Sequence, residues 1–310
     1  MTAPAASSPT PLRAAWATFA SVGRLHIVAI AALGNLTFAW VLFGVRPAWL
    51  AAVCALDWYV VNLLNRVVDL PEDRANAIAG VDFVERHRRA LLALGLALLV
   101  GSLVATLLLA PRLTPWRLAF HALGLAYNWP LLPGRRRIKQ LYFWKNTASA
   151  VGFLVTLFAY PLAGLAEGAT GPAFLADVSW VTVGVAATFF FLFELSYEVI
   201  YDLRDVVGDR AEGVRSYPVV HGERGATRLI DALLLASALV LAGGYAAQVV
   251  PWRLVVMLAA PALQVVLYKA LQRRGGIGST HCIGLTWLGA SLLAVYHLWV
   301  IFDLPGARGP

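Results

Sequence analysis

The sequence predicts an all-α integral membrane protein, a bundle of about nine transmembrane helices, from its composition, its hydropathy and its span-length apolar runs. Of the 310 residues, 60% are hydrophobic and only 14% are charged, and the mean hydropathy is +0.71. Soluble domains are about 45–50% apolar and about 25% charged, so this excess requires a membrane as solvent. A hydrocarbon core of about 30 Å takes about 20 helical residues per crossing, which bounds the chain at about nine or ten spans and excludes a large soluble domain.

Nine apolar runs of span length follow one another between charge clusters and Pro or Gly turns. The expected spans are 26–45, 47–68, 90–110, 115–133, 142–164, 180–201, 228–249, 251–271 and 281–302. The breaks between them are, in order, the turn 44–47, the charged segment 69–89, Pro111, the Pro and Arg loop 130–139, the Gly-containing stretch 164–171, the charged segment 202–228, Pro251 and the basic loop 273–278. Residues 1–25 lack the pattern of a signal peptide and are expected to be a polar cytoplasmic tail, residues 26–303 a single membrane domain, and residues 304–310 a short tail.

The Lys and Arg residues are distributed unevenly between alternate loops. The tail and the loops after the second, fourth, sixth and eighth spans carry most of the 25, and the opposite side carries only Arg46, Arg112, Arg117, Arg253 and Arg308. The positive-inside rule therefore places the N-terminus and these basic loops in the cytoplasm, and an odd number of spans places the C-terminus outside, with a bacterial inner membrane as the expected location. The net charge of +8 then reflects topology and attraction to lipid headgroups, so neither a nucleic-acid partner nor an obligatory protein partner is expected.

Polar residues inside apolar spans are costly and have either a structural or a functional use. Asn35, Asp57 and Asn62 could line a substrate pocket or bond across helices, and the second interpretation is favoured. Cys54 and Cys282 lie far apart in apolar stretches, so they predict no disulfide framework and no paired thiolate site, and they are expected to fill the core.

A first polar constellation closes the second span. Asn65, Asp69 and Asp73 are spaced i, i+4, i+8, which places all three on one face of a helix. Pro71 interrupts this pattern, because a proline two residues after Asp69 ends or kinks the helix, and Asp73 would then approach the same space from a turn.

A second constellation closes the sixth span. Its five acids are spaced 4, 4, 3 and 4 and form a continuous stripe: Glu194, Glu198, Asp202, Asp205 and Asp209. Like charges at this spacing repel one another, and protons or cations relieve the repulsion. Mg²⁺ prefers carboxylate and phosphate oxygens and bridges one or two carboxylates to a diphosphate or triphosphate. The pattern therefore predicts a site for a substrate with a diphosphate head and an apolar tail.

The alternative is that these acids only pair with nearby arginines, of which Arg66, Arg74, Arg204 and Arg210 are within reach. Two separate clusters on the same predicted side favour the metal site. Glu194 and Glu198 lie deeper, and three roles remain open for them: supporting the metal ligands, accepting a proton, or forming structural hydrogen bonds.

These two constellations resemble the signatures of the UbiA superfamily of intramembrane prenyltransferases. The first is Asn65-x-x-x-Asp69-x-x-x-Asp73, and the second is Asp205-Val-Val-Gly-Asp209-Arg210 followed by the Pro-Val-Val-His-Gly segment 218–222. A third, looser similarity extends from the Tyr-Asn-Trp-Pro segment 127–130 to Lys145-Asn146. The family has nine transmembrane helices with both acidic motifs at one membrane face, so the resemblance covers most of the chain and implies a cytoplasmic-side active site.

The resemblance implies a mechanism in which Mg²⁺ holds a prenyl diphosphate and an allylic cation forms in an apolar chamber, where a lipophilic or aromatic acceptor captures it. The implied metal ligands are Asn65, Asp69, Asp73, Asp202, Asp205 and Asp209. The implied catalytic residues are Asp69, Asp205, Lys145, Tyr127 and Tyr201, with the tyrosines flanking the cation through their ring faces. The implied substrate-binding residues are Asn65, Arg137, Lys139, Arg204 and Glu198.

Some positions depart from the family pattern. Arg66 stands where members making ubiquinone precursors carry an acid, and the segment 76–80 replaces their Arg-Pro segment, which counts against 4-hydroxybenzoate as acceptor. His221 is expected to be a loop residue. The rival functions are a terpene cyclase of the same family, a cation-coupled carrier, and a degenerate member that only binds lipid or a partner. The carrier is disfavoured because the acids gather at one face and no span is broken in the manner of inverted repeats.

Overall fold

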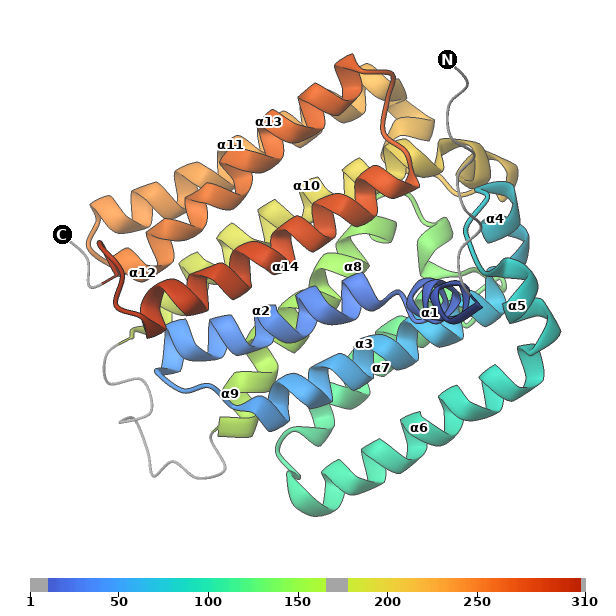
Figure 1. The fold of residues 1–310 in the computed structure, drawn as a ribbon, viewed down its shortest axis with the longest axis horizontal. Coiled ribbons are helices and arrows are strands. Elements are labelled where there is room, and N and C mark those ends of the chain that lie inside the picture. Colours follow the sequence, from blue (N-terminus) through green and yellow to red (C-terminus); the bar gives the residue numbers. More distant parts are fainter. Residues whose placement is uncertain (1–10, 166–177, 308–310) are drawn as a thin grey trace.

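The computed structural model describes residues 11–165 and 178–307, and within these ranges all regular structure is helical (Figure 1). Eight segments are long and apolar enough to cross a membrane. They are α2 (Leu25–Phe43), α3 (Ala48–Val68), α6 (Arg88–Leu109), α8 with α9 (Trp144–Leu165), α10 (Trp180–Ala211), α11 (Tyr217–Ala246), α12 with α13 (Trp252–Arg273) and α14 (Ser279–Ile301). The predicted all-helical membrane class is confirmed.

The fourth predicted span, 115–133, is occupied by a shorter helix, α7 (Thr114–Asn128). With 15 residues it measures about 22 Å, which is less than the hydrocarbon core of about 30 Å. It ends early because Trp129 precedes Pro130 and adopts an extended conformation, with φ −103° and ψ 152°.

Four short helices lie outside the long spans in sequence: α1 (Pro11–Val22), within the expected N-terminal tail, α4 (Leu70–Ala75), α5 (Val81–Arg86) and the 3₁₀ turn η1 (Ile138–Gln140). The break predicted at Pro71 is present, since α3 ends at Val68 and α4 begins at Leu70 with the proline in its first turn. Figure 1 shows α1, α4 and α5 at the same end of the bundle.

Two spans are longer than the sequence predicts. The helix α10 has 32 residues and continues through the whole acidic stripe, because no proline interrupts it and Gly213, at φ 66°, lies just beyond its end. The helix α11 begins at Tyr217 and kinks at Gly222, which has φ 72° and ψ 171°. His221, expected in a loop, therefore lies in the first turns of α11, where its ring nitrogen is 2.6 Å from the Tyr142 hydroxyl.

The largest apolar core lies between α2, α3, α8, the π-helical turn η2 (Val155–Ala159) and α10. Aromatic rings dominate it, and Trp58 stacks on Phe153 with ring centroids 4.0 Å apart. Cys54 and Cys282 are both fully buried, as a filling role requires. By contrast, α6 forms one edge of the bundle (Figure 1) and buries only Gly95, Leu99 and Thr106, so its leucines face lipid.

The polar residues inside the spans bond mainly between helices. Asn35 donates to the Thr156 carbonyl oxygen at 2.6 Å. The Asp57 carboxylate accepts hydrogen bonds from Arg117, at 2.8 Å for Nε, and from the Tyr160 hydroxyl at 2.7 Å. Asn62 differs, because its amide donates to the Trp58 carbonyl within α3 and it also lines the cavity described below.

Candidate active site

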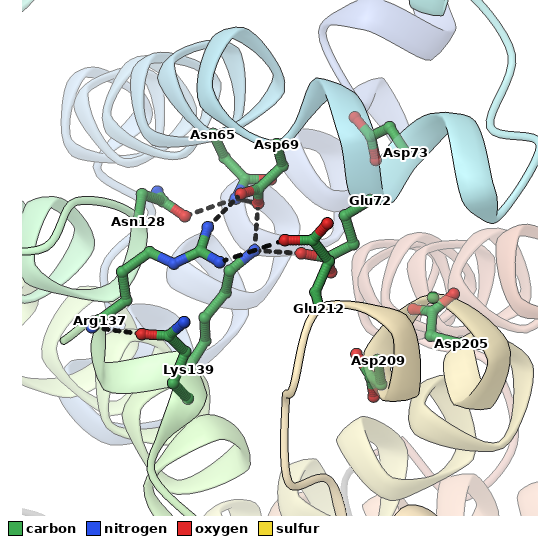
Figure 2. Close-up of polar contacts among 12 residues, drawn as sticks. Asn65, Asp69, Glu72, Asp73, Asn128, Arg137, Lys139, Asp205, Asp209 and Glu212 are labelled. Carbon is green, nitrogen blue, oxygen red and sulfur yellow. Dashed lines mark hydrogen bonds and ion pairs between the residues drawn. The ribbon is translucent and has the colours of Figure 1, made fainter.

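The first constellation is assembled where α3 ends. The Asn65 amide nitrogen donates to Asp69 Oδ2 at 2.6 Å and to Asn128 Oδ1 at 2.5 Å, so the last turn of α3 is joined to the end of α7 (Figure 2). The first contact follows directly from the i, i+4 spacing. The second orients the Asn65 side chain so that its amide faces the aspartate.

Two basic residues from the loop after α7 neutralise Asp69 (Figure 2). Arg137 Nη1 donates to Asp69 Oδ1 at 3.1 Å, and Lys139 Nζ lies 2.6 Å from Asp69 Oδ2. Lys139 also pairs with Glu72, and Arg137 Nη2 lies 3.9 Å from a Glu212 carboxylate oxygen near the end of α10. Lys139 is 2% exposed, so this cation is held in the site rather than in water.

Asp73 lies on α4, apart from the Asn65–Asp69 pair (Figure 2). Its carboxylate pairs with Arg66, and Arg24 lies 3.7 Å away. Arg66, a departure from the family pattern, also donates to the Ala79 carbonyl oxygen at 2.6 Å. The arginine thus anchors α4 and the loop that follows it, and Asp73 lies on this separate short helix rather than in the turn that Pro71 led us to expect.

The second constellation is organised by Lys145 in the first turn of α8. Its Nζ lies 2.8 Å from Asp202 and 2.8 Å from Asp209, and Asn146 donates to Asp202 at 2.9 Å. Asp205 instead pairs with the adjacent Arg204, through Nε at 2.6 Å. Every aspartate of the two motifs therefore has a basic partner in this structure.

The two motifs also touch one another. The Gly208 backbone N–H on α10 donates to Asn76 Oδ1 at 3.0 Å, and Asn76 lies directly after α4. A Cβ at position 208 would lie 2.4 Å from the Asn76 amide atoms, closer than atoms can approach. Only glycine fits this contact, which explains the Gly in the Asp-Val-Val-Gly-Asp run.

Both constellations open onto one cavity of about 840 Å³. Its polar end is lined by Asn65, Asp69, Glu72, Asp73, Asn76, Asn128, Lys139, Lys145, Glu198, Asp202, Arg204 and Asp205. Its remaining wall is largely apolar and aromatic, with Trp58, Phe120, Phe153, Phe189, Phe190 and Phe193 among the lining residues. The predicted site residues Arg137 and Asp209 do not line it and instead hold the lining residues Asp69 and Lys145.

The two predicted tyrosines both line the cavity, in different settings. The Tyr201 hydroxyl lies 2.6 Å from Thr286 Oγ1, and the Arg204 guanidinium covers its ring at 4.8 Å from the centroid. That face of Tyr201 is already occupied by a cation. Tyr127, one residue before Asn128, presents its side chain to the cavity.

The donor chemistry of this end fits Mg²⁺ bound together with a diphosphate. Within residues 11–165 and 178–307, no three acidic, His or Cys side chains converge into a ready-made metal shell. The carboxylates instead lie on α3, α4 and α10 around a common space, and Mg²⁺ that bridges to phosphate oxygens needs only one or two protein carboxylates. An all-oxygen donor set beside Lys and Arg suits that combination.

Sequence reasoning missed four polar residues of the site: Asn76, Asn128, Asn146 and Ser149. Asn128 and Asn146 lie inside the loosely similar third segment, and that similarity could have identified them. Ser149 donates to Glu198 at 2.7 Å one turn beyond Lys145, a position that helical spacing also marks. Asn76 had no local signal, because its partner Gly208 lies on another helix.

Comparisons with known proteins identify the family and the fold. The sequence model of the UbiA prenyltransferase family matches residues 16–282. A solved UbiA homologue from Archaeoglobus fulgidus, bound to GPP and Mg²⁺, superposes with a TM-score of 0.67 at 14% identity, covering 92% of this chain and 99% of that one. An apo UbiA homologue from Aeropyrum pernix K1 superposes with a TM-score of 0.62 at 18% identity, covering 89% of this chain and 97% of that one.

A third solved structure, described as digeranylgeranylglyceryl phosphate synthase, gives a TM-score of 0.53 at 15% identity, covering 93% of this chain and 96% of that one. At these identities the likeness shows a shared fold. No curated protein sequence matches the chain significantly.

Proposed function

The chain belongs to the UbiA prenyltransferase family, and we propose that it is a Mg²⁺-dependent prenyltransferase that moves a prenyl group from a prenyl diphosphate to a lipophilic or aromatic acceptor within the membrane. This proposal rests on the separation of polar and apolar side chains around the cavity. One end gathers acidic and basic side chains from α3, α4, η1, α8 and α10, and the remaining wall is largely apolar and aromatic. An amphiphile with a diphosphate head and an isoprenoid tail matches both parts.

The residues that would hold Mg²⁺ are Asn65, Asp69, Asp73, Asp202 and Asp205, which line the polar end. Asp209, also predicted as a ligand, would contribute by orienting Lys145. When bound, Mg²⁺ supplies positive charge that stabilises the diphosphate as a leaving group. Solved structures of a UbiA homologue from Archaeoglobus fulgidus, one bound to GPP and Mg²⁺ and one to DMAPP and Mg²⁺, support the assignment of both ligands.

Three cavity-lining cations, Lys139, Lys145 and Arg204, are placed to bind the diphosphate oxygens. In the present structure each of them is paired with a motif aspartate. A bound diphosphate would share these cations, so they would stabilise the charge that develops as the C1–O bond breaks and its electron pair leaves with the diphosphate. The acceptor then forms the new bond to C1 and loses a proton.

The apolar wall gives the second requirement, exclusion of water from the allylic cation. The aromatic residues Trp58, Phe153 and Phe190 line this part of the cavity and exclude water from it. Tyr127 is placed nearer the polar end, beside Asn128, where the charge first develops. A terpene cyclase of the same family would use the same chamber, with the prenyl chain itself capturing the cation.

Diphosphate release distinguishes these functions. The purified full chain in lipid nanodiscs is incubated with geranyl, farnesyl or geranylgeranyl diphosphate, with Mg²⁺ or with a chelator, in the presence and absence of phenolic, naphtholic and alcohol acceptors. Release that needs both Mg²⁺ and an acceptor is the expected result. Release without any acceptor would identify a cyclase. Absence of both release and Mg²⁺-dependent diphosphate binding would contradict the proposal and favour the carrier.

A further inference from the structure

Glu194 is an acidic side chain inside the cavity for which the diphosphate chemistry has no use. It is 7% exposed and lines the cavity, and among the described residues it makes no hydrogen bond and no ion pair. An unpaired carboxyl group in an apolar membrane interior is costly, and such groups mark functional sites. Its neighbour Glu198, one turn further along α10, accepts a hydrogen bond from Ser149 at 2.7 Å.

Glu194 lies too far from the diphosphate end to act as a metal ligand there. It precedes Asp202 by eight residues on the continuous helix α10, which is about 12 Å along the axis. Its own level of the cavity is lined by Phe190, Phe193 and Tyr197. The carboxyl group therefore faces the apolar part of the chamber, away from the diphosphate end.

The basic residues that line the cavity are all engaged elsewhere. Arg24, Lys139, Lys145 and Arg204 each pair with an aspartate of the two motifs. His26 lies in the first turn of α2, two residues after Arg24, at that same end. In the described part of the chain, no Lys or Arg faces Glu194, so an anionic group placed beside it would lose its hydration without gaining a cation.

Resting on the proposed function, we infer that Glu194 forms the acceptor subsite and selects acceptors that present a neutral hydroxyl group there rather than a carboxylate or phosphate. A hydroxyl group donates a hydrogen bond to the carboxyl oxygen and gives Glu194 the partner that it lacks. The acceptor ring then extends along the cavity towards the diphosphate end. A carboxylate at the same place would lose its hydration, and no Lys or Arg among the described residues faces Glu194 to compensate that loss.

Matched acceptor pairs test this subsite. Hydroquinone is compared with 2,5-dihydroxybenzoate, and 1,4-naphthalenediol with 1,4-dihydroxy-2-naphthoate, so that each pair differs only in a carboxylate. Prenylation and ligand-induced thermal stabilisation are both measured on the full chain in nanodiscs. The neutral member of a pair should have at least tenfold higher kcat/KM and should stabilise the protein more.

Glu194→Gln keeps the shape and replaces the carboxyl group with an amide, whose N–H groups can donate a hydrogen bond to an acceptor carboxylate. It should raise KM for the neutral acceptor and reduce the discrimination within each pair to below threefold, with a much smaller change in kcat, whereas Glu194→Asp should retain the preference. Glu223→Gln, at an exposed position on α11, is the matched control and should behave as wild type.

The subsite is overturned if wild type prefers the carboxylate member, if Glu194→Gln leaves the discrimination unchanged, or if neither member of any pair binds or reacts. Mg²⁺-dependent binding of geranyl diphosphate, measured on the same samples, separates this failure from that of the proposed function. Retained diphosphate binding without discrimination refutes only the subsite, and absent diphosphate binding refutes the function itself.

Discussion

Asp69 and Asp205 belong to different motifs but have similar surroundings, since each lines the cavity and each is paired with a basic residue. Replacing either by alanine removes an oxygen ligand and leaves the paired cation without its partner. We expect Asp69→Ala and Asp205→Ala each to lower prenyl transfer at least 100-fold, about 2.7 kcal/mol of transition-state stabilisation, while the protein still inserts into the membrane. Product formation and yield from purified membranes measure both effects.

Asp82 provides the control for these two substitutions. Its side chain is 85% exposed and pairs only with Arg74 at the surface. Exposed ion pairs contribute little to the free energy of unfolding, and Asp82 does not line the cavity, so Asp82→Ala should retain wild-type activity. Near-normal turnover by Asp69→Ala or Asp205→Ala would contradict the assignment of these residues to the diphosphate site.

Some of these residue contacts could be predicted from the sequence and others could not. The Asn65–Asp69 contact follows from helical spacing, and the acidic stripe on α10 was visible as a run of carboxylates. The pairing of Lys145 with Asp209 could not be predicted, because 64 residues separate them and only the packing of α8 on α10 joins them. Arg66 appeared only as a departure from the family, and its role as partner of Asp73 depends on the turn at Pro71.

At the scale of elements, the hydrogen bond between Gly208 on α10 and Asn76, directly after α4, fixes the position of the two motifs relative to one another. Gly208→Ala would place a methyl group 2.4 Å from the Asn76 side chain, so the Asn76 amide would have to move and lose its hydrogen bond from the backbone N–H of residue 208. Overpacking of this kind costs about 1–3 kcal/mol. We expect the variant to lose about tenfold or more in kcat/KM for the prenyl diphosphate, measured with acceptor in excess.

Gly184 offers a matched control on the same helix, since a Cβ there has no neighbouring atom within 4 Å. Gly184→Ala should leave activity unchanged and raise stability slightly, because alanine favours the helix by up to about 1 kcal/mol. Adding Asn76→Ala to Gly208→Ala relieves the clash. The loss of kcat/KM in the double variant should therefore be smaller than the losses of the two single variants combined. Strict additivity would show that the two residues act independently.

The positions of the helices were easier to predict than their ends. Hydropathy located every span, because burying apolar side chains in lipid is a local property of each segment. The early end of α7 followed from Pro130, a signal present in the sequence, but it was obscured by the apolar residues around it. The extension of α10 to Ala211 could not be read from hydropathy, since its last three turns are charged and remain helical because they pack against α4 and α8.

At the scale of the whole molecule, a buried charge network joins α3, α6, α7 and α9. Arg117 is 0% exposed and donates to Asp57, to the Ser102 carbonyl oxygen at 2.7 Å and to the Ser102 hydroxyl at 2.9 Å. Removing one partner of a buried pair costs about 3–5 kcal/mol, because the other charge stays buried. Arg117→Met should therefore lower the midpoint of thermal unfolding strongly.

The comparison for this variant is Arg89→Met, at an exposed position at the start of α6, which should unfold like wild type. Adding Asp57→Asn to Arg117→Met removes the stranded charge, so the double variant should recover part of the lost stability. Size-exclusion profiles of the heated, detergent-solubilised full chain give the midpoints. Equal midpoints for Arg117→Met and wild type would show that the network contributes nothing to stability.

The charge distribution predicts the orientation of the whole bundle. Ala247 and Arg274 are exposed at opposite ends of the α12–α13 span, and the positive-inside rule places Arg274 in the cytoplasm. In a Cys54→Ser, Cys282→Ser background, Ala247→Cys should react with an impermeant maleimide applied to intact cells, and Arg274→Cys should react only after the cells are opened. The reverse pattern would refute the predicted topology.

The length of α10 has a consequence for how the protein meets its substrate. Its 32 residues measure about 48 Å, whereas the hydrocarbon layer is about 30 Å thick, so the end that carries Asp202 and Asp205 extends to the headgroup level while the rest remains at tail depth. A prenyl diphosphate already lies in the leaflet with its head and tail at these two depths, and it can enter by sliding sideways without leaving the membrane. The search for substrate is then two-dimensional. At constant bulk concentration, adding inert lipid should slow the reaction, because the rate follows the mole fraction of substrate in the bilayer.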